Sequence, residues 1–296
     1  MSNLERAYAS LRGLALGDAF GERFFGDRGH AWNCIRLRYL PVAPWEWTDD
    51  TAMALSVYRV LRDHGQIHQE ELALSFAAEH RLEPGRGYGR GAHDVLSAIS
   101  ACRGWRQAAA DLFGGEGSCG NGAAMRVAPV GAFFYQDLEK VVQQARLSAE
   151  ITHAHPDGIA GAIAVALAAA LVLRGLSGRE LLDEVRKRTP AGATRHGLEK
   201  ALNLPAETPL SEVVKTLGNG SEVLSSDTVP YSLWCAGHYG GDFQEALWKT
   251  VEGLGDRDTT CAIVGGILGA ARPLPEDWWA CCEPIPFNAD SAVGHP

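Results

Sequence analysis

The sequence lacks any cluster of basic residues. Its 296 residues include 27 Lys and Arg against 36 Asp and Glu, which gives a formal net charge of −9. Proteins that act mainly on nucleic acid or on an anionic membrane surface usually carry a basic patch, because phosphate groups are negative. This chain therefore carries no strong nucleic-acid signal, and we expect neither nucleic acid nor a membrane as its main partner.

The chain also lacks paired cysteines. Its seven cysteines are scattered, form no C-x-x-C motif, and are odd in number. This usage is typical of a reducing compartment rather than of a disulfide framework. The first twelve residues, M-S-N-L-E-R-A-Y-A-S-L-R, carry charges where a secretory signal would need an apolar core. We therefore expect a cytoplasmic protein.

No apolar run reaches the roughly 20 residues that span a bilayer. The longest run, I-A-G-A-I-A-V-A-L-A-A-A-L-V-L at Ile159 to Leu173, is shorter and consists mostly of alanine. A membrane segment is one interpretation of this run. A buried central helix is favoured, because the small alanine side chains would let neighbouring helices approach closely.

Strand patterns are almost absent, and I-R-L-R-Y-L at 35–40 is the one short candidate. Apolar residues recur at helical spacing along most of the chain, as in T-A-M-A-L-S-V-Y-R-V-L-R. The sequence predicts a compact all-α fold with one domain over residues 1–296 and a core at about 10–272. We expect the polar span 189–226 at the periphery and an irregular tail, 273–296, on the surface.

Two adjacent carboxylates open one of the predicted helices. In W-T-D-D-T, Asp49 and Asp50 lie between Thr48 and Thr51, directly before an apolar run. Thr or Asp at the N-cap and acidic residues in the first turn stabilise a helix N-terminus, so a simple acidic first turn is one interpretation. A cap needs only one carboxylate, however, and the second carboxylate is left unexplained.

A second acidic cluster opens a helix near the other end of the chain. In G-D-R-D-T-T, Asp256, Asp258 and Thr259 precede a glycine- and alanine-rich segment suited to a tight interior position. If the two clusters meet, four carboxylates and several hydroxyls form a hard-oxygen environment that suits Mg²⁺, Mn²⁺ or Ca²⁺ and not Zn²⁺. Without cations these carboxylates would repel one another and be driven to protonate.

A glycine-rich loop, F-G-G-E-G-S-C-G-N-G-A-A-M-R at 113–126, runs into a predicted helix. Exposed backbone N–H groups before a helix N-terminus suit a phosphate or pyrophosphate. The loop matches neither a dinucleotide-binding nor a Walker pattern, so a plain surface loop is the alternative. A second loop, R-G-Y-G-R-G-A at 86–92, has the same two interpretations.

Two further groups of titratable residues also allow a structural and a functional interpretation. His153 and His155 follow a long predicted helix, whose C-terminus favours a histidine, but His153 could instead reach a site. Asp18, Glu22 and Asp27 lie in L-A-L-G-D-A-F-G-E-R-F-F-G-D at the end of the first predicted helix. The structural interpretation is that Asp18 helps to terminate this helix and that the other two are solvated.

Five segments, in order, resemble the ADP-ribosylglycohydrolase family, the group of dinitrogenase-reductase-activating glycohydrolase and of the ADP-ribosylarginine and ADP-ribosylserine hydrolases. They are G-D-A-x-G, W-T-D-D-T, G-S-x-G-N-G-A-A-M-R, T-H and G-D-x-D-T-T-x-A-x-x-G-x-I-x-G-A. The resemblance covers about residues 10–272. It implies a single-domain, multi-helix orthogonal bundle whose central cleft holds two Mg²⁺ ions, with Mn²⁺ as the alternative metal.

The resemblance also implies roles for individual residues. The implied metal ligands are Thr48, Asp49, Asp50, Asp256, Asp258 and Thr259. The implied substrate contacts are Phe113 beside the adenine, Gly117, Ser118, Gly120, Asn121 and Gly122 around the pyrophosphate and ribose, and His153 near the ribose. Asp50 or Asp256 is expected to be the catalytic carboxylate that handles the proton, and Glu22 is the other candidate.

The chain departs from the family pattern at three positions. The family commonly has a glutamate shortly after G-D-A-x-G, proposed to prepare the attacking water or to guard the metals, and Phe25 stands there instead. Cys119 replaces the aromatic residue of the serine-hydrolase branch. Arg257 replaces a small polar residue, and its guanidinium could pair with a substrate phosphate or temper the carboxylate charge.

The sequence therefore predicts a Mg²⁺-dependent hydrolase that cleaves the N- or O-glycosidic bond at the anomeric carbon of ADP-ribose. Its partner would be an ADP-ribosylated protein side chain or an ADP-ribose-containing small molecule. A non-catalytic ADP-ribose-binding module, motivated by Phe25, and a metal-dependent nucleotide phosphohydrolase are the alternatives. The sequence leaves the acceptor and the oligomeric state open, although the large interior is compatible with a monomer.

Overall fold

The computed structural model describes residues 1–286 and confirms the all-α fold class. These residues form α-helices and one 3₁₀ helix, and pair as β-structure only in two isolated bridges. In chain order the elements are α1 (Asn3–Glu22), α2 (Arg28–Leu37), α3 (Asp49–His64), α4 (Gln69–Leu82), α5 (Arg90–Ser100), α6 (Trp105–Ala110), η1 (Leu112–Gly115), α7 (Gly122–Met125), α8 (Ala128–Phe133), α9 (Leu138–Glu150), α10 (Pro156–Leu173), α11 (Gly178–Arg188), α12 (Ala193–Ala201), α13 (Leu210–Leu217), α14 (Ser225–Tyr239), α15 (Phe243–Val251), α16 (Arg257–Gly269) and α17 (Glu276–Trp279).

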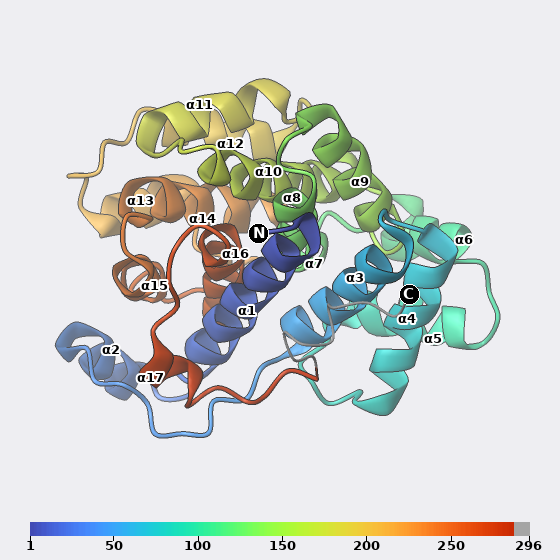
Figure 1. Cartoon of the computed structure of the whole chain (residues 1–296), viewed down its shortest axis with the longest axis horizontal. Coiled ribbons are helices and arrows are strands. Elements are labelled where there is room, and N and C mark those ends of the chain that lie inside the picture. The colour runs from blue at the N-terminus through green and yellow to red at the C-terminus, as the bar shows by residue number, and fades with distance from the viewer. Residues whose placement is uncertain (287–296) are drawn as a thin grey trace.

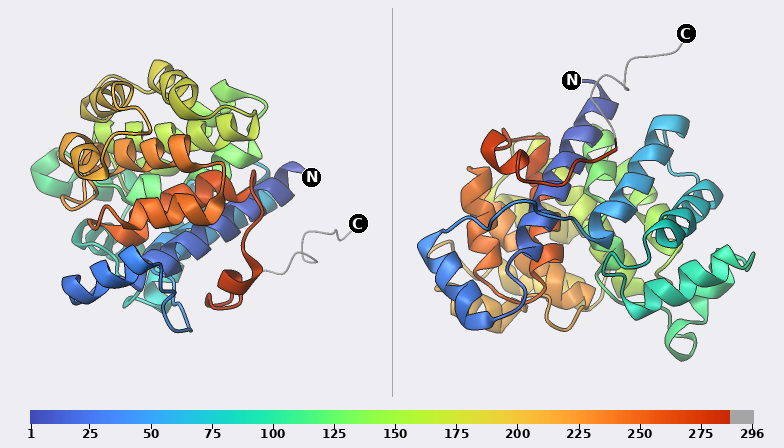
Figure 2. Two further views of the ribbon diagram at one scale, coloured as in Figure 1. Left: turned by 90° about the vertical axis from the view of Figure 1, so that its left-hand side faces the viewer. Right: turned by 90° about the horizontal axis from the view of Figure 1, so that it is seen from below.

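The helices α1 and α16 share the most extensive helix–helix contact of the described residues. They lie side by side, with α3 on the other side of α1 (Figures 1 and 2). Gly13, Gly17 and Gly21 recur every four residues and so share one face of α1. A Cβ atom at any of the three would overlap the backbone of α16, at Gly265, Cys261 and Arg257 respectively. Because the glycines face these residues in reverse order, the two helices are antiparallel.

The long apolar run of the sequence forms α10, which is a core helix. By length and composition alone α10 could cross a membrane, but 78% of its 18 residues are buried inside the protein. It packs against α7, α8, α9 and α14. Alanine occupies much of this helix, from Ala160 to Ala170, and the α8 backbone comes so close that a Cβ atom at Gly131 would overlap the Ala166 carbonyl oxygen.

The predicted strand at 35–40 is wrong, because its first three residues belong to α2. Asp27 caps this helix by accepting a hydrogen bond from the backbone N–H of His30. Only Ala31 and Ile35, one helical turn apart, are buried in α2. The alternation of I-R-L-R-Y-L therefore does not mark a buried strand face, and Leu37 is half exposed.

The described part of the expected irregular surface tail, residues 273–286, is irregular apart from one short helix, but it is not confined to the surface. Residues 276–279 form α17, and Trp278 is 2% exposed. The Trp278 ring stacks on Phe20 of α1, with ring centroids 4.7 Å apart. The free energy gained by burying these large aromatic rings holds this segment on the core, although the backbone around it is irregular and contains prolines. The rest of the predicted tail, 287–296, lies outside the described residues.

We predict that Gly17→Ala destabilises the protein by about 1–3 kcal/mol, because the new methyl group forces α1 and α16 apart. Urea denaturation of the purified variant measures this loss. Gly85→Ala is the matched control, since nothing lies within 4 Å of its added Cβ atom. Equal stability of the two variants would show that the contact between α1 and α16 can yield without cost.

Candidate active site

Asp18 joins the end of α1 to the start of α3. Its buried carboxylate accepts hydrogen bonds from the backbone N–H and hydroxyl of Thr48 and from the same two groups of Thr51, at 2.5–3.1 Å. Burial nevertheless raises the pKa of Asp18 to about 6, against these hydrogen bonds, which lower it. The structural interpretation of Asp18 as a helix terminator is wrong, because α1 continues to Glu22.

The first acidic cluster lies at the N-terminus of α3, as the sequence predicted. Thr48 is the N-cap, and its hydroxyl accepts a hydrogen bond from the Asp50 N–H while donating its own proton to Asp18. Asp49 is 8% exposed, and burial followed by the neighbouring charge of Asp18 raises its pKa to about 8. The dipole of α3 favours the charged form of Asp49 and Asp50, but burial and the repulsion between the two carboxylates oppose their ionisation.

The second acidic cluster, at the N-terminus of α16, meets the first. The Thr259 hydroxyl lies 3.5 Å from Oδ1 of Asp50. Asp256 is the N-cap residue of α16, and its Oδ2 accepts a 2.7 Å hydrogen bond from the side-chain amide of Asn121. Asp258 follows in the first turn and is buried. Residues 209 positions apart in the sequence therefore share one acidic centre.

Two oxygens of this centre have no hydrogen-bond partner among the described residues, namely Asp50 Oδ2 and Asp258 Oδ1. Burial, and then neighbouring carboxylates including Asp18, raise the pKa of both groups well above the usual range. Buried carboxylates of this kind are paired with cations or protonated. Their hard oxygens fit Mg²⁺ or Mn²⁺.

The present side-chain positions do not yet enclose an ion. Residues 1–286 contain no group of three or more Asp, Glu, His or Cys side chains already placed to hold a metal. Thr hydroxyls at the start of both helices are further oxygen ligands of the kind that Mg²⁺ binds.

A glycine-rich loop forms the opposite wall. Gly114, Gly115 and Gly117 have positive φ angles of 74°, 98° and 73°, which glycine adopts at no steric cost. The Ser118 hydroxyl accepts a hydrogen bond from the Gly120 N–H. Asn121 donates from its side chain to Thr228 as well as to Asp256, and so joins the loop to the second acidic cluster. The loop is thus part of the site and not a plain surface loop.

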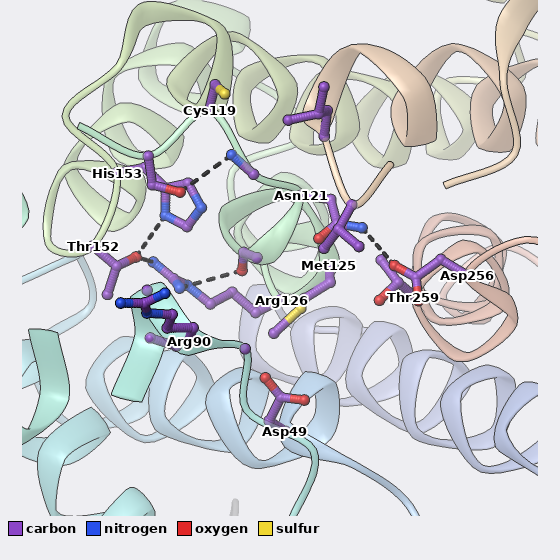
Figure 3. Close-up of a pocket in the computed structure, with 18 of the residues that line it drawn as sticks. Asp49, Arg90, Cys119, Asn121, Met125, Arg126, Thr152, His153, Asp256 and Thr259 are labelled. Carbon is purple, nitrogen blue, oxygen red and sulfur yellow. Dashed lines mark hydrogen bonds between the residues drawn. The ribbon is translucent and has the colours of Figure 1, made fainter. Parts of the chain in front are cut away.

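Between the acidic centre and this loop lies a cavity of about 780 Å³. Figure 3 shows side chains from both walls converging on it. Most of the residues singled out from the sequence line it: Asp49, Asp50, Phe113, Gly117, Ser118, Gly120, Asn121, Gly122, His153, Asp256, Asp258 and Thr259. The second glycine loop also contributes, through Gly87, Gly89, Arg90, Gly91 and Ala92.

Two of the predicted site residues do not line the cavity. Thr48 lies behind the first cluster, where Asp18 holds its hydroxyl. Glu22 is half-buried outside the wall, and burial followed by the charge of Asp18 raises its pKa. Phe25, at the position of the family glutamate, is 42% exposed and lies under the Arg257 guanidinium at 4.5 Å.

Sequence reasoning missed several residues of the site. Arg126 is fully buried, lines the cavity and donates to the carbonyl oxygens of Gly122 and Ser148 and to the Thr152 hydroxyl. Its sequence signal is a lone charge in the apolar stretch A-A-M-R-V-A-P. Residues 222–224 also line the cavity, so the polar span 189–226 is peripheral only in part.

The fold and this cavity define a helical protein in which a buried acidic centre faces a glycine-rich loop. Comparison with known proteins narrows the class further. Residues 1–292 match the profile of the ADP-ribosylglycohydrolase family. ADP-ribosylhydrolase ARH3 of Homo sapiens is 32% identical over 273 residues, which cover 80% of this chain and 74% of that protein. The chain therefore belongs to the ADP-ribosylglycohydrolase family.

More distant relatives agree with this assignment. An uncharacterized protein of Archaeoglobus fulgidus is 31% identical, covering 90% of this chain and 88% of its own length. ADP-ribosylarginine hydrolase Tri1 of Pseudomonas putida is 25% identical, and the match covers 93% of this chain and 73% of that protein. A solved ADP-ribosylglycohydrolase-related protein complex has a TM-score of 0.68 at 23% identity, covering 95% of this chain and 93% of that chain, and shows the same fold.

We predict that the metal-free protein loses stability as the pH rises from about 4 to 8. The native carboxyls of Asp18 and Asp49, with pKa values raised to about 6 and about 8, retain protons that the unfolded chain has released above pH 3.8. The native state binds more protons, so the free energy of unfolding falls with rising pH. Melting temperatures in EDTA between pH 5 and 8 measure this.

Asp49→Asn is the control variant, because an amide cannot titrate in this range. Its melting temperature should fall less steeply than that of the wild type between pH 6 and 8, and added Mg²⁺ should flatten the wild-type curve. A wild-type curve parallel to that of Asp49→Asn would contradict the raised pKa of Asp49.

Proposed function

We propose that this protein is a hydrolase that cleaves the glycosidic bond at the anomeric carbon of ADP-ribose and releases it from a modified acceptor. The observation that carries the proposal is the cavity itself, which joins a glycine loop to buried carboxylates whose oxygens have no hydrogen-bond partner in residues 1–286. The first feature suits divalent cations and the second suits a pyrophosphate. The relatives' printed names, ADP-ribosylhydrolase and ADP-ribosylarginine hydrolase, support the same reaction.

The proposed cation ligands come from both acidic clusters, and two Mg²⁺ ions, with Mn²⁺ as the alternative, are proposed there. The ligands are Thr48, Asp49, Asp50, Asp256, Asp258 and Thr259. Such ions supply Lewis acidity toward ribose hydroxyls and water. The Thr48 hydroxyl already donates to Asp18 and accepts from the Asp50 N–H, so only its remaining lone pair is available for an ion.

The proton transfer is assigned to Asp256 or Asp50. Asp256 Oδ2 is oriented by the Asn121 amide, and one oxygen of Asp50 is unpartnered among residues 1–286. Both carboxylates border the cavity, where a side chain can reach the reacting atoms. Glu22 stands outside the cavity wall.

The substrate would lie along the glycine loop. The backbone N–H groups of Gly117, Gly120 and Asn121 already donate within the protein, so those of Ser118, Cys119 and Gly122 are the ones proposed for the pyrophosphate. His153 also lines the cavity and is proposed to contact the ribose. Phe113 stands at the cavity edge with 62% of its surface exposed, which leaves a ring face available to an adenine. Its φ of 52° is a strained conformation for a non-glycine residue and is typical of ligand-binding positions.

We also propose a reducing, cytoplasmic location. All seven cysteines are free thiols, and three of them, Cys235, Cys261 and Cys282, are buried. Burial raises the pKa of each of these three thiols, so they are protonated and unreactive at neutral pH.

A non-catalytic ADP-ribose-binding module remains the second candidate because of Phe25. No carboxylate replaces the family glutamate at that position, and the Phe25 ring packs under Arg257 rather than at the acidic centre. This candidate predicts that ADP-ribose binds while no linkage is cleaved.

We predict that the protein releases free ADP-ribose from at least one of arginine-, serine- and acetyl-linked substrates in Mg²⁺, and that EDTA abolishes the release. Chromatography of the products measures it. Binding of ADP-ribose without release would establish the binding module. Release of phosphate or AMP instead would establish a phosphohydrolase.

On the cleaved substrate, we predict that Asp50→Asn and Asp256→Asn each lower kcat by at least about 100-fold, because each removes a carboxylate from the acidic centre. Glu22→Gln is the control, since it neutralises a half-buried carboxylate outside the cavity wall. If Glu22→Gln instead loses activity while both Asp variants keep it, the catalytic role passes to Glu22.

A further inference from the structure

Arg126 and Thr152, which have no role in the proposed reaction so far, form a chain of hydrogen bonds with His153 in one wall of the cavity. The Arg126 guanidinium donates through Nη2 to the Thr152 hydroxyl at 2.9 Å, and this hydroxyl lies 2.8 Å from Nδ1 of His153. Figure 3 shows the three residues in sequence along the wall. All three are buried, with exposed fractions of 0%, 3% and 6%.

The direction of the hydrogen bonds in this chain follows from the chemistry of its members. A guanidinium has donors only, so the Thr152 oxygen must accept from Arg126. The hydroxyl has one proton to donate, and among residues 1–286 its other hydrogen-bond partner is Nδ1 of His153. Nδ1 therefore accepts, and the ring proton of neutral His153 is on Nε2.

The charge state of His153 agrees with this assignment. Burial, and then the positive charge of Arg126, lower the pKa of His153 to about 3. Arg126 itself is held by two backbone carbonyls and by the Phe76 ring, 4.4 Å from its guanidinium carbon. The imidazole is therefore neutral at physiological pH, and its tautomer rather than its charge decides what it can bind.

The Nε2 atom faces the space beside the glycine loop. No described residue accepts a hydrogen bond from it, and His153 lines the cavity. A Cβ atom at Gly120 or Gly122 would lie 3.7 or 3.6 Å from Nε2, so a larger side chain at either position would crowd this atom. The donor is thus left for a ligand.

We propose that Arg126 and Thr152 are positioning residues that hold His153 as its Nε2–H tautomer, so that the imidazole donates a hydrogen bond to an oxygen of the bound ligand. The ligand's identity as ADP-ribose rests on the proposed function, whereas the tautomer does not. The accepting oxygen is a diphosphate oxygen or a hydroxyl of the terminal ribose. The unprotonated Nε2 of the other tautomer would repel an anionic oxygen.

The test is histidine NMR on the full chain labelled with ¹⁵N-histidine. The resonances of His153, one of ten histidines, are identified by their absence in His153→Gln. Long-range ¹H–¹⁵N spectra of the wild type should show a protonated Nε2 and an unprotonated Nδ1. Thr152→Ser, which keeps the hydroxyl, should give the same pattern, and Thr152→Val, of equal size without the proton donor, should give a mixture of tautomers.

Calorimetry with ADP-ribose provides the second measurement. Thr152→Val should weaken binding about tenfold, as expected for the loss of one well-oriented hydrogen bond, and Thr152→Ser should restore it to within about twofold. Repeating the titration with ADP shows which oxygen accepts the hydrogen bond from His153. If Thr152→Val loses affinity for both ligands, the accepting oxygen belongs to the diphosphate. If it loses affinity for ADP-ribose alone, the accepting oxygen belongs to the terminal ribose.

Three results would overturn the proposal. These are an Nδ1–H tautomer in the wild type, a Thr152→Val spectrum identical to the wild type, or equal loss of affinity in the Ser and Val variants. Failure of the proposed function gives a different result: the wild-type spectrum shows the Nε2–H tautomer, but no ADP-ribose is released from any substrate. If ADP-ribose does not bind at all, the spectra alone decide the tautomer.

Discussion

The site depends on the antiparallel contact between α1 and α16. Because Gly13, Gly17 and Gly21 have no side chains, the two backbones touch directly. This contact places Asp18, near the end of α1, beside the start of α16. Asp18 in turn fixes the start of α3 through Thr48 and Thr51. Three helices from distant parts of the chain therefore meet at one acidic point.

The carboxylates at this point are not equivalent. Asp18 accepts four hydrogen bonds, so its oxygens are satisfied by the protein. Asp50 and Asp258 each retain an oxygen without a partner among the described residues. Raised pKa values throughout the cluster reflect the cost of burying like charges together. The arrangement keeps the structural role of Asp18 separate from the open ligands that a cation would use.

The glycine-rich loop forms the wall of the cavity opposite the acidic centre. Its glycines allow a tight loop that presents backbone groups, and Asn121 connects that loop to Asp256. Behind the loop, Arg126 places a buried positive charge beside the cavity, close enough to Asp49 for the two charges to interact (Figure 3). The cavity therefore joins an acidic centre to a wall that carries a fixed positive charge.

The sequence alone determined the all-α class, the helix starts at Thr48 and Asp256, and the oxygen chemistry of the two clusters. These features are local, since caps, first-turn acids and apolar periodicity act within a few residues. Only the tertiary structure decided the burial of Trp278, the role of Asp18 and the contact of Arg126 and His153 with Thr152. Each of these depends on contacts between helices, which a local pattern does not encode.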